Sequence, residues 1–202
     1  MAVTAVTGEI GSGKSTAARI LAEKLGCVCF DADRVAKGCW LCEDVKAQAA
    51  SRWGSEILNT SGQLIIPKLA EHIFSSKSEH DFCSSLIHPI VMQGLRELAQ
   101  NHSDSVLEIP LLPEAGRPDW IDRVIYVAAD FAVRAERCRV QRGWSVEELR
   151  RRESYLLPQN VRMSVCEVVI HNDGGINELA ELIEAAIQHI SVNKHYSLNT
   201  NN

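Results

Sequence analysis

Three things are missing from this 202-residue sequence: a long apolar run, an excess of positive charge, and a complete metal-binding set of cysteines and histidines. A membrane-spanning helix needs about 20 consecutive apolar residues, and no apolar stretch of the sequence approaches that length, so we expect no membrane partner. The net charge of −5 argues against a nucleic acid as the main partner, because nucleic-acid-binding proteins usually carry a basic surface. The first residues already resemble a strand, so we expect no signal peptide and a cytoplasmic location.

The seven cysteines do not predict a disulfide framework, since their number is odd. Cys27, Cys29 and Cys166 fall in expected core strands, where a thiol behaves as a small apolar group. Cys39 and Cys42 form a C-x-x-C pair, but no second pair completes a zinc site. We therefore expect reduced thiols, with a metal or redox role for the pair as the less favoured alternative.

What the sequence does contain is a phosphate-binding pattern, G-x-x-x-x-G-K-[ST], over residues 8–16. A β-branched run precedes it at residues 2–7, and apolar residues at helical spacing follow it. In this order, backbone N–H groups and the positive end of the helix dipole surround a phosphate. A glycine-rich turn that happens to contain lysine is the alternative. We expect Lys14 to reach the terminal phosphates of ATP and Ser15 to bind Mg²⁺. The expected nucleotide-binding residues of the loop are Gly8, Gly11, Ser12, Gly13, Lys14, Ser15 and Thr16.

Strand and helix patterns alternate along much of the chain, which predicts an α/β fold. The fold is a parallel five-stranded sheet between two helical layers, a three-layer α/β/α arrangement. The expected strands span residues 2–7, 27–30, 105–109, 123–128 and 167–170. The expected helices span residues 16–25, 45–53, 67–74, 89–98, 131–141 and 176–190. Pro67 and Pro89 suit the first turn of a helix, and residues 75–79 suggest a polar loop.

These patterns divide the chain into parts. Residues 1–31, 105–131 and 166–190 form the nucleotide-binding core, and the stretch 32–104, which lacks strong strands, forms a helical insertion. We expect residues 132–165 to form an arginine-rich lid and residues 191–202 to form a polar, flexible tail. Ligands of parallel α/β sheets bind at the carboxyl ends of the strands. Leu111 follows one such end, and we expect it to contact the acceptor substrate.

Asp31 and Asp33 follow the second expected strand. In an extended chain their side chains point to the same side. One of them can then accept a proton from a substrate hydroxyl, and either can act on the metal through water. A functional role is favoured for Asp33, and Asp31 is an expected metal residue. The alternative is that one of them caps the next helix.

Eight of the fourteen arginines fall between Arg134 and Arg162. Guanidinium groups bind phosphate through two parallel hydrogen bonds, so we expect Arg137 and Arg142 to bind the phosphates of ATP. Residues 150–152 are expected on a solvated face, paired with nearby glutamates. His88 with Pro89 is a weaker signal, because a lone histidine is more often structural.

Taken together, these motifs resemble the dephospho-coenzyme A kinase family over most of the chain, from Ala5 to about Ala186. The phosphate loop alone specifies only the P-loop superfamily, whereas the other motifs, in this order, indicate the family. The matching motifs are residues 8–16, Phe30-Asp31-Ala32-Asp33, Gly54, Gly62-Gln63-Leu64, Ile73-Phe74, Leu86-Ile87-His88-Pro89, Ile109-Pro110-Leu111-Leu112 with Glu114, and Val169-Ile170-His171-Asn172 with Gly174.

The resemblance implies transfer of the ATP γ-phosphate to the ribose 3′-hydroxyl of dephospho-coenzyme A, with ATP and Mg²⁺ as cofactors. It implies that Asp33 orients or deprotonates that hydroxyl and that Arg142 is the lid arginine on the phosphates. His88 and Pro89 are implied in the acceptor site. Asn172 and Gly174 are implied near the adenine.

The chain departs from the family pattern at three places. Glu9 stands where the family usually has glycine, and its carboxylate would repel ATP unless the side chain points outward. Ile66 replaces a usual arginine, for which Lys68 is a substitute, and Gln159 is the nearest match to a lid glutamine. Two alternatives therefore stay open: a kinase of another small alcohol, as in shikimate and gluconate kinases, and a nucleotide-binding homologue that has lost catalysis.

Overall fold

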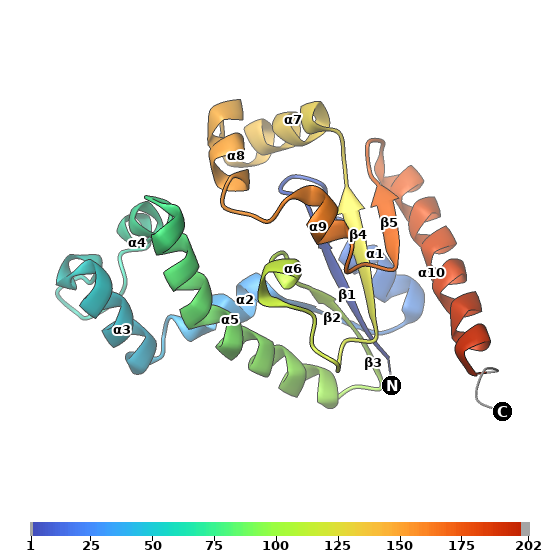
Figure 1. The fold of residues 1–202 in the computed structure, drawn as a ribbon, viewed down its shortest axis with the longest axis horizontal. Coiled ribbons are helices and arrows are strands. Elements are labelled where there is room, and N and C mark those ends of the chain that lie inside the picture. Colours follow the sequence, from blue (N-terminus) through green and yellow to red (C-terminus); the bar gives the residue numbers. More distant parts are fainter. Residues whose placement is uncertain (1, 199–202) are drawn as a thin grey trace. The chain divides into compact units, whose positions relative to one another are not determined.

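The structure is a computed structural model that describes residues 2–198, and the side chains of residues 2–190 (Figure 1). The chain forms two compact units. The first contains residues 1–30 and 99–202, and the second contains residues 31–98. The helical insertion was expected at residues 32–104.

The first unit is built on a five-stranded parallel sheet with helices on both sides, as expected. Its strands lie in the order β2-β3-β1-β4-β5. They are β1 (Ala2–Gly8), β2 (Val28–Asp31), β3 (Asp104–Glu108), β4 (Arg123–Ala128) and β5 (Val168–His171). The central strand β1 pairs Ala5 with Leu107 of β3 and with Val124 of β4. The three central strands β1, β3 and β4 are buried, which explains why their sequences show continuous β-branched and apolar runs.

Six helices of the described chain surround this sheet (Figure 1). They are α1 (Lys14–Leu25), α6 (Leu112–Ala115), α7 (Phe131–Arg142), α8 (Val146–Glu153), α9 (Gln159–Met163) and α10 (Ile176–Leu198). Leu21 of α1 and Ile183 of α10 are buried in one apolar cluster with Val127 of β4. Helix α10 continues past its expected end at Ile190, so the expected flexible tail overlaps it. Residues 199–202 of that tail lie outside the described residues.

The second unit is helical. Its elements are α2 (Ala32–Cys39), α3 (Glu43–Trp53), the 3₁₀ helix η1 (Ser55–Ile57), α4 (Ile66–Ile73) and α5 (Lys77–Gln100), whose last two residues belong to the first unit. Ala49, Trp53, Ile57 and Leu69 form its apolar cluster.

Two expectations for this unit are wrong. Pro89 does not begin a helix but lies inside α5, and the expected loop at 75–79 is shortened because α5 begins at Lys77. The buried residues Ile87, Val91 and Leu95 follow one another at a four-residue spacing across the proline. Their burial on one helix face outweighs the single backbone hydrogen bond that a proline removes.

The expectation that three cysteines occupy core strands is also wrong. Cys27 precedes β2, Cys166 precedes β5, and Cys29 is exposed although it lies within β2. The reason is that β2 is an edge strand of the sheet. No disulfide joins the seven cysteines, all of which lie in the described residues.

The C-x-x-C pair does not resemble a metal or redox site. Cys39 is buried, and its thiol pKa is raised, chiefly by burial, which makes it a poor nucleophile. Among the side chains of residues 2–190, no three histidine, cysteine or acidic groups gather closely enough to hold a metal ion. None of the helices in residues 2–198 combines the length and the apolar character needed to cross a bilayer.

Candidate active site

The loop between β1 and α1 has the backbone of a phosphate-binding turn. Gly11 and Gly13 adopt left-handed conformations, with φ of 78° and 89°. A Cβ atom on Gly11 would lie 2.9 Å from the carbonyl oxygen of Arg134, and one on Gly13 would lie 2.5 Å from Nδ2 of Asn172. Only glycine combines this backbone conformation with such close packing.

Side chains from distant segments bind the carbonyl groups of this loop. A loop whose N–H groups converge on an anion turns its carbonyls outward, where they need donors of their own. The Nη2 atom of Arg162 in α9 donates to Gly8 O at 2.8 Å. The Nη1 atom of Arg134 in α7 donates to Ile10 O at 3.3 Å. Both arginines are buried, and the sequence analysis assigned a role to neither.

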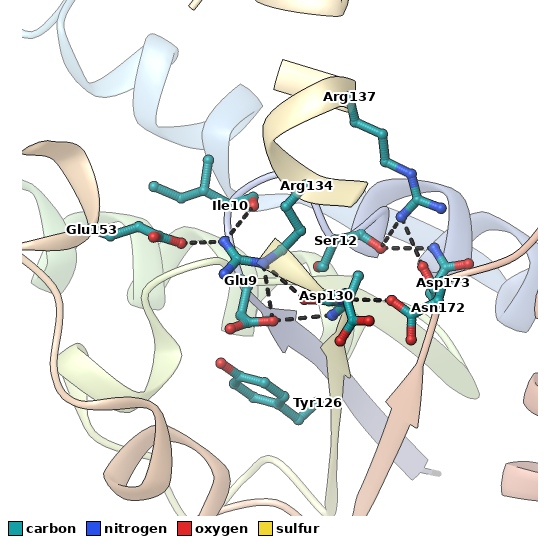
Figure 2. A network of polar contacts seen from close by, with 12 residues as sticks. Glu9, Ile10, Ser12, Tyr126, Asp130, Arg134, Arg137, Glu153, Asn172 and Asp173 are labelled. Atoms are coloured by element: carbon teal, nitrogen blue, oxygen red, sulfur yellow. Dashed lines mark hydrogen bonds and ion pairs between the residues drawn. The ribbon is translucent and has the colours of Figure 1, made fainter. Parts of the chain in front are cut away.

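Asn172 and Arg137 hold the third loop carbonyl, that of Ser12 (Figure 2). Asn172 Nδ2 donates to Ser12 O at 2.7 Å, and Arg137 Nη1 donates to the same oxygen at 3.3 Å. Arg137 also donates to the carbonyls of Asn172 and Gly174. These contacts connect the loop to the segment after β5. Both residues were expected at the nucleotide, and in the structure both support the loop that is expected to bind it.

Lys14 and Ser15 begin α1 at the centre of the site. Lys14 is buried, and its Nζ atom lies 3.5 Å from Glu9 O. Ser15 Oγ donates to Glu108 Oε1 at 2.5 Å. Glu108 is buried at the end of β3, next to β1, and the sequence analysis missed it. The signal was an acidic residue ending an apolar strand. A hydroxyl beside a carboxylate is an oxygen set of the kind that Mg²⁺ prefers.

A cavity of about 490 Å³ adjoins the loop. Its lining includes nine residues assigned from the sequence to ATP: Gly11, Gly13, Lys14, Ser15, Thr16, Arg137, Arg142, Asn172 and Gly174. It also includes Arg19, Gln141, Gly175, Ile176 and Leu179, which the sequence analysis did not assign. Gly8 and Ser12, which were also assigned to ATP, are not in this lining. Their carbonyl groups accept the hydrogen bonds of Arg162 and Asn172 that support the loop.

Arg142 lines this cavity at the end of α7. Its guanidinium carbon lies 4.8 Å from the ring centre of Trp144, and that of Arg152 lies 4.1 Å from the same ring centre. Cation–π contacts of this kind limit the positions of a long side chain. Arg142 thus lies at the cavity, with its charge held against Trp144.

Glu9 does not point into the cavity. Its side chain is buried, and its Oε2 atom accepts a hydrogen bond from Ala129 N at 3.0 Å (Figure 2). The same oxygen lies 3.3 Å from Nε of Arg134. The condition under which this carboxylate would tolerate ATP is therefore met.

The two aspartates do not form an extended pair, so that expectation is wrong. Strand β2 ends at Asp31 and helix α2 begins at Ala32, which leaves no extended run between them. Asp31 is the N-cap of α2, and its Oδ1 atom accepts a hydrogen bond from Asp33 N at 2.8 Å. The alternative that one aspartate caps the helix is confirmed for Asp31. Asp33 lies in the first turn of α2, within the second unit.

The other expected acceptor residues lie in both units. His88 and Pro89 occupy the middle of α5 in the second unit, and Leu111 is the N-cap of α6 in the first. Burial, together with the neighbouring His80, lowers the pKa of His88, which is therefore neutral at pH 7. Its Nε2 atom is buried without a hydrogen-bond partner among the described residues.

The other two departures from the family pattern, at Ile66 and Gln159, lie at helix starts. Ile66 begins α4 with its side chain 61% exposed. Lys68, the proposed substitute for the usual arginine, is exposed two residues later. Gln159 is exposed at the start of α9.

Comparison with known proteins adds independent information. A family model described as dephospho-CoA kinase matches residues 2–178. The dephospho-CoA kinase of Fusobacterium nucleatum is 31% identical over 185 residues, covering 90% of this chain and 95% of the relative. That of Chlorobium luteolum is 34% identical, covering 90% of each.

Solved structures agree in fold. The protein TT1252 of Thermus thermophilus has a TM-score of 0.74 and 28% identity, covering 93% of this chain and 97% of its own. Dephospho-CoA kinase of Campylobacter jejuni has a TM-score of 0.64 and 22% identity, covering 95% and 98%. A shikimate kinase of Bacteroides thetaiotaomicron, 13% identical with a TM-score of 0.55, shares the fold alone. From the family match and the identity to full-length relatives, the chain belongs to the dephospho-CoA kinase family.

Proposed function

We propose that this protein transfers the γ-phosphate of ATP to the ribose 3′-hydroxyl of dephospho-coenzyme A, giving coenzyme A and ADP. Its family uses ATP as phosphate donor. The observation that carries the proposal is the phosphate loop, with Lys14 and the Ser15–Glu108 contact beside a 490 Å³ cavity. A shikimate kinase and a gluconokinase share the fold, but at 13% and 18% identity their similarity shows the fold alone.

Mg²⁺ fits the oxygen ligands at the loop. Ser15 Oγ and Glu108 Oε1 lie 2.5 Å apart, and both are ligands that this ion accepts. When bound, Mg²⁺ neutralises charge on the β- and γ-phosphates. Asp31 was the other expected metal residue, but its Oδ1 atom caps α2. We therefore assign the ion to Ser15 and Glu108.

The remaining roles follow from charge and position. Lys14, Arg137 and Arg142 line the cavity, and we propose that they stabilise the charge that develops on the transferred phosphoryl group. Residues 132–165, which form α7, α8 and α9, are the proposed lid. Asn172 and Gly174 line the cavity on the proposed adenine side.

The second unit is the proposed acceptor-binding part. There Asp33 orients the attacking hydroxyl and accepts its proton. The buried Nε2 atom of His88, which has no described partner, supports a hydrogen bond from His88 to the acceptor. Pro89 beside it, and Leu111 of the first unit, are the proposed apolar contacts of the acceptor. Because ATP and this acceptor are metabolites of the cytoplasm, we propose that location for the protein.

The decisive test supplies the purified protein with Mg²⁺–ATP and one acceptor at a time, and measures ADP release. Rapid release with dephospho-coenzyme A is the expected result. Turnover only with shikimate or gluconate would reassign the acceptor. ATP binding without any turnover would indicate a homologue that has lost catalysis.

A matched pair of variants tests the base. Asp33→Asn is expected to lower kcat by roughly 10²–10⁴-fold and to leave the Kd for ATP unchanged, because only proton transfer is lost. Asp31→Asn is the control, since asparagine caps a helix as well as aspartate does. Weakened ATP binding in Asp33→Asn, with kcat retained, contradicts the assignment of Asp33 as the base.

A further inference from the structure

Glu9 is a buried carboxylate inside a loop that is proposed to bind a polyanion. Its backbone N–H donates to Val127 O at 3.1 Å, and its Oε2 atom accepts from Ala129 N at 3.0 Å. The residue is only 6% exposed. The carboxylate therefore lies against the residue that follows β4 (Figure 2).

Arg134 connects this carboxylate to three parts of the first unit. Its Nε atom lies 3.3 Å from Glu9 Oε2 and donates to Ala129 O at 2.9 Å. Its Nη1 atom donates to Ile10 O at 3.3 Å and forms an ion pair with Glu153 of α8. We call Glu9, Arg134 and Glu153 the Glu9 cluster (Figure 2).

The partners in the cluster differ in burial. The side chains of Glu9 and Arg134 are 8% and 7% exposed, whereas that of Glu153 is 26% exposed. A buried charge is strongly unfavourable without an opposite charge nearby. Arg134 can stay in this position because Glu9 offsets its charge where water has little access.

The same turn of α7 supports the loop along its length. Arg134 binds the Ile10 carbonyl, and three residues later Arg137 binds the Ser12 carbonyl. Gly11, between these two loop residues, packs against the backbone of Arg134, as the 2.9 Å approach of its added Cβ shows. Loss of Arg134 from its position removes the donor of one loop carbonyl and frees the loop to rotate there.

We propose that Glu9 and Arg134 are positioning residues that hold the loop in its nucleotide-binding shape, with Glu153 extending this support to α8. The inference rests on the proposed function only in that the loop binds a nucleotide. Neutralising a carboxylate near bound phosphates strengthens binding if the charge acts by repulsion. If Glu9 acts through Arg134, the same change weakens binding.

The test is the variant Glu9→Gln, with ADP as the probe and calorimetry as the measurement, so that no acceptor is needed. We expect the Kd for ADP to rise roughly tenfold, since contacting residues in one network couple by this order of magnitude. The control is Glu136→Gln. This change also removes one carboxylate charge, but from the exposed ion pair that Glu136 forms with Arg139 on α7, the helix that carries Arg134. Its Kd is expected to match wild type. An equal or lower Kd in Glu9→Gln overturns the proposal.

Two further measurements separate positioning from general stability. A merely structural role lowers the thermal midpoint but leaves the Kd unchanged at temperatures where the variant is fully folded. For the double variant Glu9→Gln/Arg134→Met, we expect a rise in the Kd for ADP that is smaller than the product of the rises in the two single variants. The reason is that each single change already removes the partner of the other residue. Additive effects would show that Glu9 does not act through Arg134.

A second variant keeps the proposal testable if Glu9→Gln does not fold. Glu153→Gln changes the more exposed partner, and we expect it to raise the Kd for ADP by a smaller factor, about two- to threefold. If Glu9→Gln cannot be measured because it does not fold, an unchanged Kd for ADP in a folded Glu153→Gln protein overturns the proposal. Failure of wild type itself to bind ADP counts against the proposed function instead.

Discussion

The two units of the chain hold their charged side chains in different ways. In the first unit, Arg134 and Arg162 are 6% and 4% exposed, and they bind backbone carbonyls as well as carboxylates. In the second unit, the ion pairs Arg52–Glu79 and Lys77–Asp81 lie at the surface. Of the eleven buried polar or charged residues in the part with described side chains, only His80 belongs to the second unit.

This difference shows which part of the molecule specifies a precise geometry. A buried polar group must find partners in fixed directions, so a set of such groups favours one arrangement of the backbone. Seven of these groups belong to the phosphate loop or contact it: Glu9, Ser12, Lys14, Glu108, Arg134, Arg162 and Asn172. The second unit is held instead by its apolar cluster around Trp53, which tolerates more variation.

The largest expected difference between the units concerns the arginines. Arg162→Gln leaves the Glu114 carboxylate, 3.1 Å from Arg162 Nε, without its buried counter-ion. We expect the free energy of unfolding to fall by about 3–5 kcal/mol. Arg52→Gln removes an exposed pair, for which a much smaller loss is expected. Urea denaturation of both variants measures these losses, and equal losses would remove the distinction between the units.

The next largest effect concerns the loop that these arginines support. Lys14→Ala is expected to lower kcat/KM by about 10²–10³-fold, because the buried charge that we propose to stabilise the transferred phosphoryl group is lost. Lys24→Ala, on the same helix but in a surface ion pair with Glu184, is the matched control. Steady-state kinetics with Mg²⁺–ATP tests both. If Lys14→Ala were as active as the control, the phosphate loop would not act in catalysis through Lys14.

The fold of the first unit was predictable because its signals are local. All five expected strands are present, and the central strands β1, β3 and β4, which are buried, produce the continuous apolar runs. The loop over residues 8–16 was predictable because its turn needs left-handed backbone at Gly11 and Gly13, which glycine adopts without strain. Lys14 and Ser15 followed from that loop.

The partners of the loop were not predictable, because burial is not visible in a run of arginines. Arg134 and Arg150 look alike in the sequence, yet the first is buried and the second exposed. The N-cap at Asp31 depended on where a strand stops, which the sequence locates only approximately. Pro89 misled because a proline normally marks a helix start, whereas here a long apolar face carries the helix across it.

The smallest expected effect tests whether the two units open independently. One half-buried thiol in each unit reports its opening. Burial raises the pKa of Cys166 in the first unit and of Cys83 in the second to about 12, so very little thiolate is present at pH 8. A disulfide reagent at pH 8 should therefore modify the exposed Cys29 and Cys42 rapidly and the half-buried Cys83 and Cys166 slowly, with most of the slow reaction occurring when their unit opens.

ADP at about ten times its Kd should slow modification of Cys166 about tenfold, because the ligand stabilises the unit that binds it by about 1.4 kcal/mol. Cys83 is expected to react at an unchanged rate, since the cavity is lined by first-unit residues alone. Peptide mapping by mass spectrometry follows each thiol separately, and the exposed Cys29 and Cys42 provide the internal reference for reagent strength. Equal slowing of Cys83 and Cys166 would mean that the two units open together, and that the buried polar groups of the first unit restrain the second as well.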